Sequence, residues 1–182
     1  MLYELRNYSV ADGRMEEEFA RARACIFSEG EGGLGLFERH GIPRPVGIWR
    51  ALTGPRLPLA TFIYRWESAA QRWKAFASFS NDPDWLKERD RTNGRGQIVE
   101  HMDNLLLVGE PIASVSMRGI HEFCRITDGE PVVPALGPLH PLCGGDLRPL
   151  YLRIHSDVEL PHEAPPADTR VLYVPVDLSL LP

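Results

Sequence analysis

The chain begins Met1-Leu-Tyr-Glu-Leu-Arg-Asn-Tyr-Ser-Val10, a stretch that predicts a strand from residue 2 and places charged side chains on it. Alternation puts Glu4, Arg6 and Tyr8 together on one face of this strand. The later strands of this half are rich in Trp, Tyr and Leu, which predicts a sheet that is buried on both faces. An isolated buried charge is costly, so we expect Glu4 and Arg6 either to pair with each other or to line an enclosed ligand cavity.

The first 110 residues predict the element order β-α-β-β-α-β. Apolar residues recur at helical spacing from Met15 to Ile26, and a glycine-rich run at 28–33 interrupts this helix. Ser68 is a suitable N-cap for a later helix, because its side chain can accept a hydrogen bond from the first turn, and a further short helix is expected to start at Asn81 or Asp82 with Pro83 in its first turn. Strands are expected at 2–10, 46–52, 59–66 and 98–108.

These segments, taken in this order, resemble the NIPSNAP family. The residues that carry the resemblance are 2–8, 11–15, 37–41, 46–49, 64–68, 82–85 and 103–107. The resemblance implies an α+β unit of the ferredoxin-like dimeric α/β-barrel type, in which antiparallel four-stranded sheets face each other around a cavity. It implies little about the reaction, because this fold superfamily includes cofactor-free monooxygenases, haem-degrading enzymes, isomerases and plain binding proteins.

The second half, residues 111–182, has a different composition and holds 11 of the 16 prolines, which disfavours long helices. Residues 120–126 nevertheless echo residues 2–8, with Glu122 in the place of Glu4. We interpret 111–182 as a degenerate, helix-poor second repeat beside the ferredoxin-like domain at 1–110. Strands are expected at 120–126, 150–158 and 170–178. The sequence leaves open whether the barrel closes within one chain, as a pseudo-dimer, or between the two chains of a homodimer.

The aromatic residues of the middle strands are the candidate walls of the cavity. Alternation groups Phe62, Tyr64 and Trp66 on one face of their strand, and we assign Trp49 of the preceding strand to the same cavity. Together with Glu4, Arg6 and Tyr8 they predict a pocket for an apolar, flat or polyunsaturated small molecule. Glu4 is the candidate general base, Tyr8 or Tyr64 the acid, and Arg6 the group that stabilises an oxyanion. The alternative is that Glu4 and Arg6 only pair, while the aromatic side chains fill a closed barrel.

The last strand of the first half offers two further polar candidates. His101 is a possible acid or base, and Asn104 is a possible substrate ligand. The two residues have opposite parity along a strand, so only one of them can face the cavity.

A zinc site is the metal alternative that we considered. His121 and Cys124 repeat the spacing of His140 and Cys143, and all four side chains can bind zinc. On a strand, however, residues three apart point to opposite faces, so His121 and Cys124 cannot share one ion. We therefore expect no metal and no other cofactor.

The composition of the chain indicates which kinds of partner it can bind and in which cellular compartment it is expected. The net charge of −5 over 182 residues argues against nucleic-acid binding. There is no apolar run long enough for a membrane span and no secretory signal, and the odd number of cysteines favours reduced thiols, so we expect a cytoplasmic protein. Phosphate-loop, nucleophile-elbow and zincin motifs are missing.

Two classes of function remain. The first is a cofactor-free enzyme of secondary metabolism, a cyclase, isomerase or monooxygenase-like protein that folds a small molecule against aromatic walls and moves a proton. The second is a non-catalytic module for binding small molecules or proteins, with a solid barrel. An open cavity beside Arg6 favours the enzyme, and an interior filled by side chains favours the binding module.

Overall fold

The computed structural model describes residues 1–27, 35–112, 115, 117–125, 136–142, 148–155 and 170–178. The first half contains β1 Leu2–Val10, α1 Met15–Phe27, α2 Leu36–Arg39, β2 Gly47–Ala51, β3 Leu59–Trp66, α3 Ala69–Phe79, α4 Pro83–Thr92 and β4 Val99–Gly109. The second half contributes β5 Ile120–Arg125, β6 Leu136–Pro141, β7 Leu150–His155 and β8 Arg170–Pro175. The glycine-rich run expected at 28–33 lies outside the described residues.

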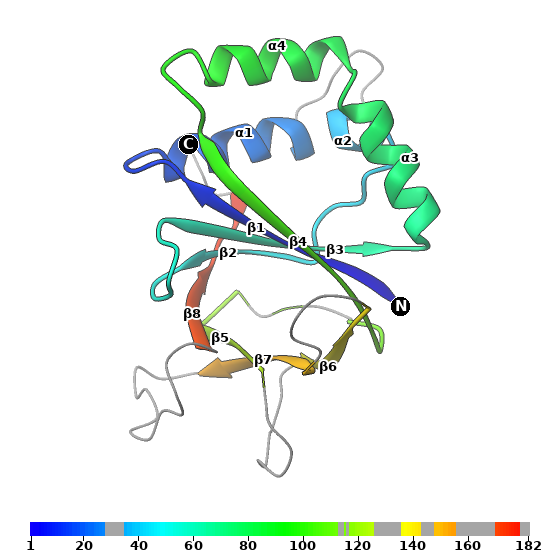
Figure 1. The fold of residues 1–182 in the computed structure, drawn as a ribbon, viewed down its shortest axis with the longest axis vertical. Helices are drawn as coiled ribbons and strands as arrows, with labels where there is room; N and C mark the ends of the chain where they lie inside the picture. Colours follow the sequence, from blue (N-terminus) through cyan, green and yellow to red (C-terminus); the bar gives the residue numbers. More distant parts are fainter. Residues whose placement is uncertain are drawn as a thin grey trace.

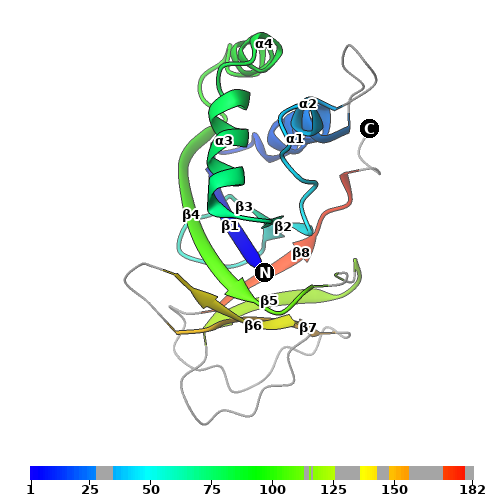
Figure 2. The same cartoon turned by 90° about the vertical axis from the view of Figure 1, so that its right-hand side faces the viewer.

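The strands of the described residues form one closed barrel in the order β1-β3-β2-β8-β5-β7-β6-β4, and neighbouring strands are antiparallel (Figure 1). The barrel therefore closes within one chain. Helices α1 to α4 lie on the outer side of the sheet made by β1 to β4, and β5 to β8 face that sheet from the other side (Figure 2). In the first half the elements follow the β-α-β-β-α-β order of ferredoxin-like units, as expected.

The predicted Ser68 cap is confirmed, and of the two starts left open for the next helix, Asp82 is the N-cap. The Ser68 hydroxyl accepts a 3.0 Å hydrogen bond from the Gln71 backbone at the start of α3. The Asp82 carboxylate accepts a 2.8 Å hydrogen bond from the Asp84 backbone at the start of α4, where Pro83 occupies the first turn. These caps fix where the two helices begin over the sheet.

The described part of the second half contains strands and no α-helix, which agrees with its proline content. One strand, β6, was not predicted, because it holds Pro138 and Pro141. Its pairing with β7 shifts register between Leu136 and Leu139, and prolines are tolerated at such irregular positions. The strand candidate at 150–158 is described only to His155.

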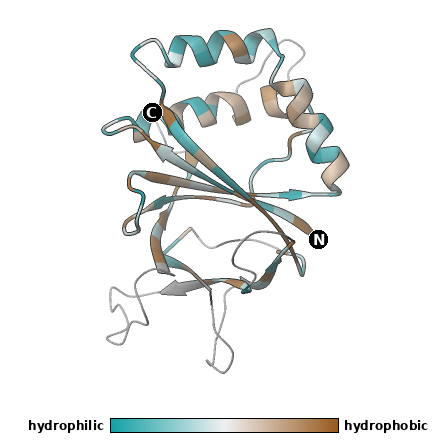
Figure 3. Ribbon diagram, in the orientation of Figure 1, coloured by the Kyte–Doolittle hydropathy of each residue, from teal (hydrophilic) through white to brown (hydrophobic). Residues whose placement is uncertain are grey.

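The sheet of β1 to β4 is covered on both faces by different groups, except along the first part of β4, where residues 100–104 are exposed. Its inner face meets β5 to β8 and forms the barrel interior, whose main buried side chains are Tyr3, Leu5, Trp49, Ile63, Leu107, Phe123, Leu139, Leu150, Leu152 and Tyr173. On its outer face, Phe62, Tyr64 and Trp66 pack beneath the helices, in one cluster with Phe19 and Ile26 of α1 and Phe79 of α3. The strands carry both hydrophobic and hydrophilic segments, whereas α4 is mostly hydrophilic and has no fully buried residue (Figure 3).

One glycine is required by the packing of the barrel interior. The ring of Trp49 lies against Gly47, two residues earlier on β2, and a Cβ atom there would come within 2.3 Å of that ring.

Within the described residues, no helix is both long and apolar enough to cross a lipid bilayer.

Candidate functional site

Strand pairing fixes which side chains share a face with the charged row of β1. Glu4 lies opposite Tyr64 and Arg6 lies opposite Phe62 in the β1–β3 ladder, so the predicted grouping of these residues is correct. The predicted location is wrong. Phe62, Tyr64, Trp66 and Tyr8 belong to the cluster under the helices, so this row points away from the barrel interior.

Trp49 is the candidate that the structure separates from the others. It pairs with Thr61 on β3, one residue out of phase with Phe62, and its side chain lies inside the barrel. Its assignment to the same cavity is therefore wrong. Alternation within one strand does not show which residues of the neighbouring strand point to the same face. Only the pairing register between the two strands decides this.

Glu4 is fully buried and holds the charged row together. Its carboxylate accepts a 2.6 Å hydrogen bond from Arg72 of α3 and a 3.1 Å hydrogen bond from the Trp66 indole. The Arg6 Nε atom lies 3.7 Å from the same carboxylate, which is an ion pair without a hydrogen bond. Glu4 and Trp66 do not border the cavity described below, so Glu4 holds Arg6 in position from behind.

Arg6 is 7% exposed and presents its guanidinium beneath α3. Its centre lies 4.2 Å from the ring centroid of Phe76 and 5.4 Å from that of Tyr8. Burial lowers the pKa of Arg6, but the acidic groups around it, with Tyr8 and Glu4 first among them, together raise it by more, so the group stays protonated. The hydrogen bond that its Nη2 atom makes is to the thioether of Met102, at 3.0 Å.

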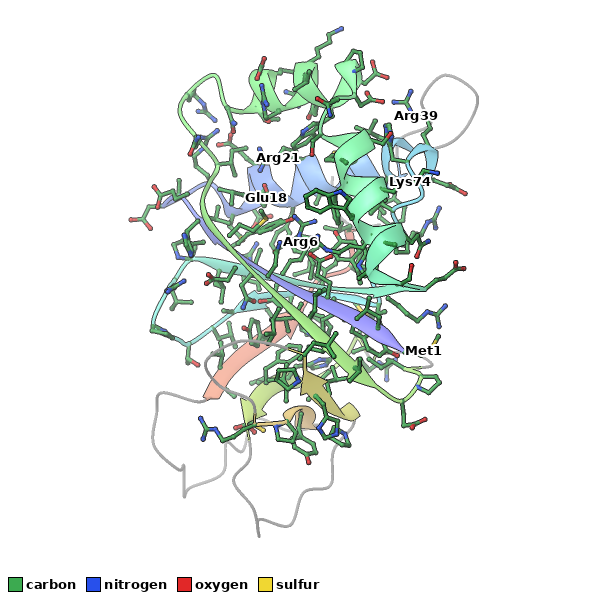
Figure 4. The ribbon with its side chains drawn as sticks, turned by 45° about the vertical axis from the view of Figure 1, so that its right-hand side comes forward. Met1, Arg6, Glu18, Arg21, Arg39 and Lys74 are labelled. Carbon is green, nitrogen blue, oxygen red and sulfur yellow. The ribbon has the colours of Figure 1, made fainter. Side chains whose placement is uncertain are left out.

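Glu18 and Arg21 form a second buried charged pair on α1, above Arg6 (Figure 4). Burial raises the pKa of Glu18, and the opposing effect of Arg21 does not cancel this rise. Sequence reasoning missed both residues, although a signal was present. They lie in the same helical stripe as Met15, Ala22 and Cys25, which face the core.

A cavity of about 430 Å³ lies between the helices and the sheet and brings these groups together. Arg6, Tyr8, Glu18 and Arg21 all line it. Its aromatic walls are Phe37, Phe62, Tyr64, Phe76, Phe79 and Trp85. Its size is that of small-molecule sites in proteins. Burial raises the pKa of Tyr8 to about 12 and that of Tyr64 well above its usual value, so both phenols are hydrogen-bond donors at neutral pH.

The cavity reaches the surface beside the beginning of β4, where exposed Gln97, Glu100 and His101 border it. His101 Nε2 lies 2.9 Å from Asp103 Oδ1, and both side chains are more than half exposed. Asn104 pairs with Arg6 across the β1–β4 ladder and shares its face, but it is exposed and does not line the cavity. Asn104 therefore lies on the same face of the sheet as Arg6 but outside the cavity, whereas His101 lies at the mouth of the cavity.

The polar groups of the barrel interior are matched with one another. Trp49 Nε1 donates a 2.8 Å hydrogen bond to His121 Nδ1, and His121 Nε2 lies 3.1 Å from the Arg118 carbonyl oxygen. Both ring nitrogens of His121 are therefore occupied, as in a neutral imidazole. Among the residues that the structure describes there is no cluster of metal-ligating side chains, and Cys143 of the zinc alternative lies outside them.

The fold and the site define an α+β protein with a filled antiparallel barrel and a ligand-sized cavity under its helices. Residues 3–113 match the family model of NIPSNAP, which is more than half of the chain. The chain therefore belongs to the NIPSNAP family. No curated protein matches it in sequence.

Several solved structures are similar to the first part of the chain. A protein from Agrobacterium tumefaciens has a TM-score of 0.47 and 19% identity, over 60% of this chain and 94% of its own. An uncharacterised NIPSNAP domain protein from Burkholderia xenovorans has a TM-score of 0.44 and 24% identity, over 64% and 99%. A Nitrosomonas europaea protein, provisionally described as an antibiotic biosynthesis monooxygenase, has a TM-score of 0.38 and 15% identity, over 60% and 98%.

Proposed function

We propose that this chain is a cytoplasmic small-molecule enzyme that performs acid–base chemistry without a bound cofactor in the cavity under its helices. One observation carries the proposal. A cavity of about 430 Å³ with aromatic walls is bordered by a guanidinium, a phenol and a buried carboxyl group. The pKa of that carboxyl group, Glu18, is raised by burial, a feature that is common among groups that transfer protons.

Each polar group of the cavity has a distinct role in this proposal. Glu18 takes the role of general base that the sequence suggested for Glu4, because Glu18 borders the cavity and Glu4 does not. Tyr8 donates a proton or a hydrogen bond, since its raised pKa keeps the phenol neutral. Arg6 stabilises negative charge on the substrate. His101 stays the second candidate proton carrier, at the mouth.

The substrate that fits this site is apolar and flat or polyunsaturated, as the sequence suggested. Phe62 and Tyr64 are stacked with an interplanar angle of 13° and form one wall, and the walls on the helix side are aromatic as well. Cyclisation, isomerisation and cofactor-free monooxygenation with O2 as the oxidant can each begin with removal of a proton from a carbon atom of such a molecule. Those three reactions of secondary metabolism are the ones we propose.

The alternative is a non-catalytic binding module, and the filled barrel interior is the observation in its favour. Because the barrel interior is filled while a cavity lies outside it, both the enzyme and the binding module are compatible with this fold. The two classes differ in whether the bound molecule is chemically converted.

The test is exchange of carbon-bound hydrogen for deuterium in heavy water, followed by nuclear magnetic resonance. A panel of aromatic and polyunsaturated ketones and acids is first screened for binding by thermal shift. We expect bound compounds to gain deuterium, and Glu18→Gln to lose about 10²–10⁴-fold in rate while still binding them. Ala22→Phe, which fills the cavity wall, should abolish binding. Tight binding to the wild type with no exchange at any concentration would support the binding module instead.

We also propose that residues 111–182 are a degenerate second repeat that replaces a partner subunit. The strand order β8-β5-β7-β6 repeats the order β4-β1-β3-β2, and buried Glu122 on β5 corresponds to buried Glu4 on β1. An intrachain pseudo-dimer of this kind is expected to be a monomer in sedimentation equilibrium. A stable homodimer would show that the second half does not replace a subunit.

A further inference from the structure

Arg6 has fewer hydrogen-bond partners than a buried guanidinium requires. A guanidinium carries five N–H donors and accepts nothing. The Nε atom of Arg6 is buried and makes no hydrogen bond within the described residues, and Nη2 donates to the sulfur of Met102, which is a weak acceptor. Aromatic rings at 4.2 and 5.4 Å favour the positive charge but accept no conventional hydrogen bond.

The charges around Arg6 do not balance. Glu18 and Arg21 neutralise each other. Glu4 is shared between Arg72, at 2.6 Å, and Arg6, at 3.7 Å, so two positive charges face one negative charge. Glu100 borders the cavity at its mouth, where it is exposed and its charge is screened by water. Among the residues that the structure describes, one positive charge in the enclosed part of the site therefore has no counterion.

We propose that the cavity binds an apolar carboxylic acid as its anion, with the carboxylate held by the guanidinium of Arg6. This inference rests on the proposed function and specifies its substrate class. A carboxylate supplies the acceptors that Arg6 lacks and the single negative charge that the site lacks. The aromatic walls contact the rest of the molecule, and the phenol of Tyr8 lies beside Arg6 as a further donor.

A single negative charge fits this site better than a phosphate group. The free donors belong to Arg6. Of the other two arginines that line the cavity, Arg21 is paired with Glu18 and Arg89 with Asp90, and the remaining walls are mostly aromatic. A doubly charged group would bring excess negative charge into this apolar enclosure.

Matched pairs of acids and amides test the inference, because a carboxamide has the shape of a carboxylate without its charge. The probes are benzoate and benzamide, 2-naphthoate and 2-naphthamide, and octanoate and octanamide, measured by titration calorimetry at neutral pH. For the wild type we expect the acid of at least one pair to bind about tenfold or more tightly than its amide, the factor of one charge-assisted hydrogen bond.

The variants assign that preference to Arg6. Arg6→Met should remove the preference, and Arg6→Lys should keep a weakened one, because lysine retains the charge without the planar fork. Arg14→Met is the control. Arg14 is ion-paired with Glu17 and does not line the cavity, so the preference should persist there. Thermal melts establish that each variant is folded.

The outcomes separate the two proposals. Equal binding of acids and amides by the wild type would overturn the carboxylate inference and leave the small-molecule cavity intact. A preference that survives in folded Arg6→Met, or disappears in Arg14→Met, would also overturn it. Absence of binding for every probe and for the neutral compounds of the exchange panel would contradict the proposed function itself. If Arg6→Met does not fold, the wild-type pairs and Arg6→Lys still decide the question.

Discussion

The two faces of the same sheet differ in how completely they are packed. On the inner face, Trp49 and His121 satisfy each other by a 2.8 Å hydrogen bond, and Thr61 contacts both Asn7 and Tyr173. On the outer face, Arg6 has an unsatisfied donor and borders a cavity of about 430 Å³. A packed, hydrogen-bonded interior contributes stability, whereas an enclosed space with unmatched charge is the kind of feature that a ligand completes.

The first prediction tests the packed face. Trp49→Ala removes a fully buried indole that packs against Gly47 and donates to His121, so we expect a loss of about 3–5 kcal/mol in unfolding free energy. Urea denaturation measures it. Trp73→Ala is the control, because Trp73 is 71% exposed and its removal should change stability by less than about 0.5 kcal/mol. Equal losses in the two variants would mean that the barrel interior is not the stabilising core.

The second prediction concerns the carboxylate that joins the two arginines. Glu4→Gln keeps the shape but weakens the hydrogen bonds to Arg72 and Trp66 and leaves both guanidiniums without a counterion. We expect a loss of about 1.5–3 kcal/mol in unfolding free energy, measured by the same denaturation. A loss below about 0.5 kcal/mol would mean that the ion pairs of Glu4 are replaced by water.

The difference between the two faces also explains what the sequence could predict. Element types followed from local patterns. The strand at 59–66, the Ser68 cap and the helix from Met15 depend on neighbouring residues alone, and all are confirmed. The start of α4 was narrowed to Asn81 or Asp82, and Asp82 is its N-cap. The grouping of Glu4 and Arg6 with Phe62 and Tyr64 also followed, because alternation within each strand is strict.

The position of the site did not follow, because it depends on which face of the sheet receives the helices. Both faces are apolar, so hydrophobic pattern does not distinguish them. The face to which Trp49 points depends on the register between β2 and β3, which the sequence does not show. The strand β6 was not recognised because it contains two prolines. Glu18 was predictable in principle from its place in the apolar stripe of α1, where a charged residue is unusual.

The third prediction is a pH effect at Glu18. Because burial raises its pKa, the folded state holds the proton more tightly than the unfolded chain. The stability that this proton contributes is complete below the usual pKa of 4.5 and is lost as pH rises through the higher folded value. Glu18→Gln cannot lose it, so the variant should gain stability relative to the wild type between acidic and neutral pH. The opposite trend would show that Arg21 dominates and that the pKa of Glu18 is lowered.

The fourth and smallest effect on stability is expected for Tyr8→Phe. The hydroxyl of Tyr8 makes no hydrogen bond within the described part of the chain, and its ring, 5.2 Å from that of Phe62, is kept by phenylalanine. We therefore expect a change of less than about 0.5 kcal/mol in unfolding free energy. The rate of deuterium exchange shows whether the hydroxyl of Tyr8 donates a proton or whether the side chain only packs. If the hydroxyl donates a proton in the proposed reaction, deuterium exchange should fall by about 10²-fold or more while the melting temperature stays constant. An unchanged exchange rate would limit Tyr8 to packing beside Arg6, and a large loss of stability would mean that the outer face is as tightly matched as the barrel interior.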